Sequence, residues 1–160
     1  MGANMKAQNI NLMKESTKAD WEVVLDVHQL CAEGAVFYKH LVDEVDDYNM
    51  SRLFTGMSCL RWAVVCDLRP YTSGAKFNDR PNKKALNHYY SLYCYVQANT
   101  KKIGSSVFIE QLQKHEMSTL WLLKLAVKRV ELRSLSIRLS TIAADVQVEN
   151  DMLEALKKQR

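Results

Sequence analysis

Four ionisable side chains fall at positions that the hydrophobic pattern places inside a helical bundle: His28, Asp67, Glu116 and Glu149. Imidazole and carboxylate groups are common ligands of iron, manganese and zinc, so a metal site for oxidase activity or metal storage is one hypothesis. In antiparallel helix pairs, His28 and Asp67 would share one level of the bundle, and Glu116 and Glu149 another. The other hypothesis is two buried pairs that fix helix register, because unpaired buried charges are costly.

The chain lacks the spacing of a di-iron carboxylate site. Such a site takes a glutamate from each of two helices and a Glu-x-x-His pair from each of the other two. The residues three positions before the four histidines are Leu25, Phe37, Ala85 and Leu112. Cys31 lies three residues after His28 and could form a thiolate, but packing is the more common role on a core-facing seam. We therefore expect no catalytic residue and no cofactor, with iron, manganese or zinc as the alternative.

Apolar residues recur at alternating spacings of three and four in four stretches, which is typical of helices that face a bundle core. They predict helices over about residues 18–46, 50–69, 106–130 and 133–158, with a short helix over about 82–98. Pro70 is expected to end the second helix. We expect residues 1–16 to be a flexible lead-in and residues 17–160 to be one domain. The predicted fold is an all-α, ferritin-like four-helix bundle, with the short helix in the long connection between helices 2 and 3.

Composition narrows the function classes. The 160 residues are 25% charged and 48% hydrophobic, and the net charge of +4 is too small to indicate nucleic acid by itself. The four cysteines show no CxxC spacing, and no secretory leader is recognisable, so we expect reduced thiols in the cytoplasm. The apolar runs are too short to span a bilayer, so we expect no membrane partner.

The predicted connection is rich in tyrosine and basic residues. The tyrosines are Tyr89, Tyr90, Tyr93 and Tyr95, and the flanking basic residues are Lys76, Arg80, Lys83, Lys84, Lys101 and Lys102. Such a mixture could stack bases and neutralise phosphates, which makes a nucleic-acid-binding accessory protein the weaker alternative. Tyr90 and Tyr93 also share a helix face with Leu86 and Val96, which favours packing or a protein interface. We expect the four tyrosines to form an interaction surface for a protein partner or a second copy.

Several short patterns carry a resemblance to a known family. They are Glu33 and Gly34 followed by Tyr38 in the first helix, Leu53–Phe54 with Arg61 and Asp67–Leu68 in the second, and Glu116 and the ending VENDMLEALK in the last two. With these features the chain resembles an uncharacterised bacterial family of ferritin-like four-helix bundles. It departs from that pattern at three positions. The family commonly has an acidic residue in place of Val36 and glutamate or glutamine in place of Leu60, and it can have a histidine in place of Asn150. The resemblance implies the fold, and the departures argue against acidic chemistry.

Gly34 lies in the middle of a predicted helix, where glycine costs about 1 kcal/mol relative to alanine. Without a Cβ atom, it could let a neighbouring helix approach closely. The alternative is that it makes room for a metal or a small ligand. Together these features predict a non-catalytic bundle that acts through protein–protein interaction or self-association.

Overall fold

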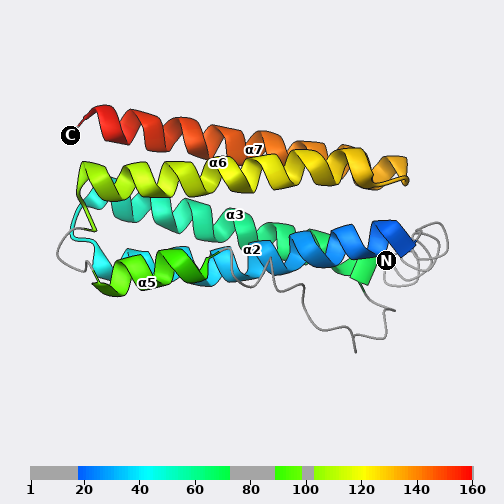
Figure 1. Ribbon diagram of the computed structural model, residues 1–160, viewed down its shortest axis with the longest axis horizontal. Coiled ribbons are helices and arrows are strands. Elements are labelled where there is room, and N and C mark those ends of the chain that lie inside the picture. The colour runs from blue at the N-terminus through cyan, green and yellow to red at the C-terminus, as the bar shows by residue number, and fades with distance from the viewer. Residues whose placement is uncertain (1–17, 73–88, 99–102, 160) are drawn as a thin grey trace, which may run out of the picture.

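A computed structural model describes residues 18–72, 89–98 and 103–159, and its elements are all helices (Figure 1). The helices are α2 (Lys18–Glu44), α3 (Tyr48–Thr72), α5 (Tyr90–Ala98), α6 (Ser106–Arg129) and α7 (Arg133–Lys158). The predicted all-α class is confirmed. The lead-in at residues 1–16 and the part of the predicted short helix before residue 89 lie outside the described residues. None of the described helices is long and apolar enough to cross a membrane.

The four long helices form two antiparallel pairs. Residues 45–47 link α2 to α3, and residues 130–132 link α6 to α7. Because these links are short, the helices that they join are antiparallel neighbours. The end of α3 and the start of α6 lie at opposite ends of the molecule, so the connection that contains α5 returns along the long axis (Figure 1). As a result α3 and α6 point in the same direction. The two pairs then pack together through α2 on α6 and α3 on α7.

The turn between α6 and α7 contains no glycine or proline, and Asp20 at the start of α2 stabilises it. The Asp20 carboxylate is fully buried and accepts hydrogen bonds from the backbone N–H groups of Glu131 (2.7 Å) and Leu132 (3.2 Å). The first N–H groups of a helix have no partner within it, and Leu132, the N-cap of α7, makes no side-chain cap of its own. A residue more than one hundred positions earlier therefore pairs with the turn and with the N–H group of the N-cap residue.

The second helix continues past Pro70, which the sequence predicted as its stop. In the structure α3 extends to Thr72 with Pro70 inside it. Proline removes one backbone hydrogen bond because it lacks an N–H group, and in the final turn few helical residues remain for its ring to displace. Tyr71 is 9% exposed and belongs to the apolar core, so burial of its ring favours the extra turn.

A polar layer divides the apolar core into two clusters. One cluster, nearer the α6–α7 turn, includes Val64 of α3, Leu120 of α6 and Val146 of α7. The other, nearer the α2–α3 link, includes Met57, Leu112 and Leu153 of the same three helices. Between these residues along each helix lie the buried side chains of Arg61, Glu116 and Glu149. The fold thus brings three charged groups to the middle of the bundle.

Candidate functional site

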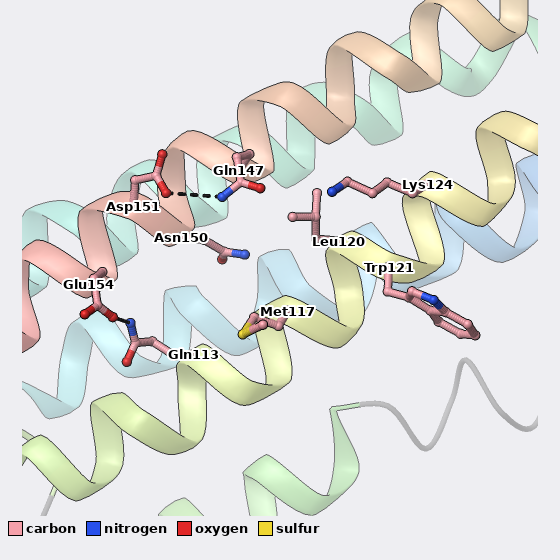
Figure 2. Close-up of a pocket in the computed structure, with 9 residues that line it drawn as sticks. All are labelled: Gln113, Met117, Leu120, Trp121, Lys124, Gln147, Asn150, Asp151 and Glu154. Carbon is pink, nitrogen blue, oxygen red and sulfur yellow. Dashed lines mark hydrogen bonds between the residues drawn. The ribbon is translucent and has the colours of Figure 1, made fainter.

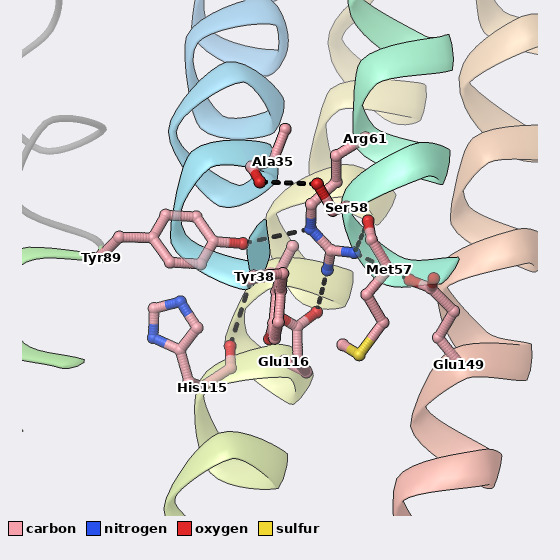
Figure 3. A network of polar contacts seen from close by, with 10 residues as sticks. Ala35, Tyr38, Met57, Ser58, Arg61, Tyr89, His115, Glu116 and Glu149 are labelled. Carbon is pink, nitrogen blue, oxygen red and sulfur yellow. Dashed lines mark hydrogen bonds and ion pairs between the residues drawn. The ribbon is translucent and has the colours of Figure 1, made fainter. Parts of the chain in front are cut away.

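Arg61 is the central residue of this polar layer. Its side chain is 2% exposed, and its guanidinium forms ion pairs with Glu116 (Nη2–Oε2, 2.5 Å) and Glu149 (Nη1–Oε1, 2.8 Å) (Figure 3). The planar guanidinium can donate in several fixed directions at once, which suits it to bridge carboxylates from two helices. Arg61 on α3 thereby connects α6 to α7.

Two tyrosines complete what we call the Arg61 layer: Arg61, Glu116, Glu149, Tyr38 and Tyr89. The Tyr38 hydroxyl donates a hydrogen bond to Oε1 of Glu116, and its ring centroid lies 4.7 Å from Cζ of Arg61, a cation–π distance. Nε of Arg61 donates to the Tyr89 hydroxyl (3.4 Å), and Nη1 also donates to the Met57 carbonyl (3.0 Å). Each long helix, together with the residue that precedes α5, therefore contributes to one hydrogen-bonded network.

Gly34 on α2 faces this network directly. A Cβ atom built on Gly34 would lie 2.7 Å from both Cδ of Arg61 and the Tyr89 hydroxyl oxygen, and 2.9 Å from Nε of Arg61. The next residue, Ala35, accepts a hydrogen bond from the Ser58 hydroxyl through its carbonyl oxygen (2.7 Å), so α2 and α3 lie close together here. The space that the glycine leaves is filled by the side chains of Arg61 and Tyr89.

Burial dominates the acid–base properties of the layer. It raises the pKa of Glu149 to about 7, although the neighbouring Arg61 acts in the opposite direction. It also raises the pKa of both Tyr38 and Tyr89, with the Glu116 charge adding to the effect, so both hydroxyls stay protonated. Burial acts to lower the pKa of Arg61, but Glu116 and the other neighbours outweigh it and hold that pKa well above its usual value. Arg61 remains a cation, and the Glu149 carboxyl titrates near neutrality.

The raised pKa of Glu149 predicts a loss of stability as the pH rises. The ordinary value of 4.5 applies to the unfolded chain and about 7 to the folded chain, so the folded state binds this proton more tightly. The contribution is complete below the unfolded pKa and is lost as pH rises through the folded pKa. From about pH 5 to about pH 8, the unfolding free energy should fall by about 2 kcal/mol more in the wild type than in Glu149→Gln.

Urea denaturation across this pH range measures both curves. The pKa of His28 is lowered by burial and then by the Arg69 charge, so His28 has the opposite pH dependence. The pKa of Glu33 is raised by burial. Both residues are present in the two proteins, so their contributions cancel in the difference. Parallel curves for the two proteins would contradict the assignment to Glu149.

The structure brings together two of the four predicted site residues. Glu116 and Glu149 do share a level, but Arg61 lies between them and pairs with both, so the two carboxylates do not form the expected pair with each other. The expected His28–Asp67 pair is wrong: Asp67 is 39% exposed and pairs with Arg138. Within the described ranges, no group of three or more histidine, cysteine, aspartate or glutamate residues could hold a metal ion.

Cys31 does not have the environment of a nucleophile. Its side chain is buried in the apolar core, and burial raises the pKa of the thiol to about 12. The thiol therefore stays protonated at neutral pH, and a thiol is a far weaker nucleophile than a thiolate. The hypothesis of a thiolate activated by His28 is not supported.

The tyrosines predicted to form a surface divide into different environments. Tyr89 is 1% exposed and belongs to the Arg61 layer, so its assignment to an interaction surface is wrong. Tyr90 is 67% exposed, whereas Tyr95 is half-buried and stacks on Phe108 with ring centroids 6.1 Å apart. The side chain of Tyr93 and the six flanking basic residues lie outside the described residues.

Sequence reasoning missed the role of Arg61. The residue lies four positions after Met57 and three before Val64, both buried, so the seam spacing contains the signal. The neighbouring Leu60 also fits a repeat of three and four between Met57 and Val64, and because it is apolar the hydrophobic pattern favours it as the core residue. Comparison with known proteins finds no matching family model, no matching curated protein and no matching solved structure.

Proposed function

We propose that this protein is a non-catalytic helical bundle that acts through protein–protein interaction or self-association. The observation that carries the proposal is that both inward-facing glutamates of α6 and α7 bind the Arg61 guanidinium. A carboxylate-bridged metal centre needs those oxygens for the metal, and a fixed cation between them repels a second positive charge. The residues present therefore do not fit an iron, manganese or zinc site.

We also propose that the helices have a ferritin-like arrangement. Two antiparallel pairs, joined by a connection that returns along the bundle, support this assignment (Figure 1). Membership of the uncharacterised bacterial family remains a prediction. A cytoplasmic location is part of the proposal, and it is supported by four free cysteines, three of them exposed.

Exposed apolar side chains on α6 and α7 support a binding role over a purely structural one. Met117 is 66% exposed and Trp121 61% exposed, and on α7 Val148 and Met152 are each about half exposed. Single exposed apolar residues such as Val148 and Met152 are ordinary, but Met117 and Trp121 line one hollow surface between α6 and α7, which is typical of an interaction site.

Metal analysis of the full-length protein tests the proposal. The protein would be incubated separately with Fe(II), Mn(II) and Zn(II), freed of unbound metal and analysed by mass spectrometry. We expect substoichiometric metal and a melting temperature that a chelator does not change. Glu110→Gln, an exposed change on α6, is the control for Glu116→Gln. Stoichiometric metal that Glu116→Gln loses and Glu110→Gln keeps would overturn the proposal in favour of the metal-protein alternative.

A further inference from the structure

A groove runs between α6 and α7 on the outer face of the molecule (Figure 2). This α6–α7 groove has a volume of about 450 Å³ and is lined by residues that include Met117, Leu120, Trp121, Lys124, Asn150 and Glu154. A second hollow of about 490 Å³ continues it, because the two share Lys124 and Gln147. The combined surface is long and open, a shape that suits a protein partner better than a small enclosed ligand.

The rim of the groove carries two large exposed apolar side chains. Met117 and Trp121 lie one helical turn apart on α6 and are 66% and 61% exposed. Tryptophan and methionine are enriched at protein interfaces, and a central tryptophan commonly contributes much of the binding energy. Covering these two side chains would remove apolar surface from water.

The floor of the groove contains a buried amide that lacks a partner. Asn150 is 9% exposed, and Figure 2 shows its side chain extending from α7 toward α6. Neither its amide nitrogen nor its amide oxygen has a hydrogen-bond partner among the described residues. Buried polar groups are almost always hydrogen-bonded, so the missing partner would be a water molecule, or an occupant of the groove that this side chain meets after a small movement.

The charges along the groove change sign from one end to the other. Lys124 and Lys128 lie at the end nearer the α6–α7 turn, and Asp151 and Glu154 lie at the other end. A uniformly acidic or basic partner would meet like charge at one end. A two-fold axis that lies in the interface, perpendicular to the line from Lys124 to Asp151, would place Lys124 of each copy opposite Asp151 of the other. The same axis sets the two Trp121 side chains near the centre of the contact.

We propose that the α6–α7 groove is the interface of a symmetric homodimer. This inference rests on the proposed interaction function and names the partner as a second copy of the same chain. Gln113 and Gln147 on the groove rim already donate hydrogen bonds to Glu154 and Asp151 of their own chain, which fixes the two carboxylates at the acidic end of the interface.

Charge reversal tests the geometry. Sedimentation equilibrium of the wild-type chain should show a monomer–dimer equilibrium. Lys124→Glu and Asp151→Lys should each raise the dissociation constant of the dimer by about tenfold or more, because each creates two like-charge contacts. An equimolar mixture of the two variants should restore dimers, because every facing pair is then opposite in charge. Arg52→Glu, an exposed change of the same size on α3, should leave the equilibrium unchanged.

Several outcomes would overturn the inference. A wild type that stays monomeric at all soluble concentrations, or a dimer that neither reversal weakens, excludes this interface. A mixture that fails to recover dimers excludes the two-fold pairing of Lys124 with Asp151. Melting curves of both variants confirm that they are folded, and the metal analysis above tests the proposed function independently of the oligomeric state.

Discussion

Replacing Arg61 with methionine is expected to lower the free energy of unfolding by about 3–5 kcal/mol. The substitution removes the cation that binds Glu116 and Glu149 and leaves two buried carboxylates without their counter-charge. It also leaves Glu116, which is 0% exposed, far from water. Urea denaturation followed by far-ultraviolet circular dichroism measures the change.

The control for this substitution is the exposed ion pair between Asp67 and Arg138, which joins the same two helices as the Arg61–Glu149 pair. Arg138 and Asp67 are 43% and 39% exposed, and solvent screens such pairs, so Arg138→Met should cost less than about 1 kcal/mol. Equal losses in Arg61→Met and Arg138→Met would contradict the central role of the buried layer.

A triple variant separates the loss of a counter-charge from the loss of packing. Arg61→Met combined with Glu116→Gln and Glu149→Leu removes every charge in the layer and keeps an acceptor for the Tyr38 hydroxyl. Replacement of a whole buried ion cluster by uncharged side chains is often neutral or stabilising. The triple variant should therefore be more stable than Arg61→Met alone by about 2 kcal/mol or more. A triple variant no more stable than the single one would show that packing by the guanidinium, and not charge, dominates.

The helical class and the helix pairs could be predicted because they depend on local information. The spacing of apolar residues and the shortness of two links determine them, and both can be seen in the sequence. The face of the second helix that is buried could not be predicted in this way. The alternating spacing of three and four from Met50 predicts a seam through Leu53, Leu60 and Asp67, whereas the structure buries Phe54, Arg61 and Leu68. Both seams contain Met50, Met57 and Val64. They differ only in whether the residue between these positions lies three or four residues after the preceding one.

The hydrophobic pattern predicted the wrong buried face of α3 because it assigns arginine to the surface. Arg61 can be buried only because two carboxylates meet it, and these come from positions 55 and 88 residues later in the chain. The same limit applies to Asp20, whose partners in the α6–α7 turn are more than one hundred residues away. Polar groups that are buried by distant partners are the features that local patterns represent least well.

Gly34→Ala is expected to lower the free energy of unfolding by about 1–2 kcal/mol, although alanine is the better helix former by about 1 kcal/mol. The added methyl group would lie 2.7 Å from Cδ of Arg61 and from the Tyr89 hydroxyl. Both atoms belong to buried, hydrogen-bonded side chains, so neither can move away without disturbing the Arg61 layer. Thermal and urea unfolding measure the loss.

Gly56 provides a matched control, because it also lies inside a helix and a Cβ atom built on it meets nothing within 4 Å. Gly56→Ala should therefore raise the unfolding free energy by about 0.5–1 kcal/mol through helix propensity alone. The same substitution thus has opposite signs at the two sites. In a Tyr89→Phe background, one of the three atoms within 3 Å of the added methyl group is absent, and the cost of Gly34→Ala should decrease. An unchanged cost there, or stabilisation by alanine at both glycines, would mean that Gly34 does not make room for Arg61 and Tyr89.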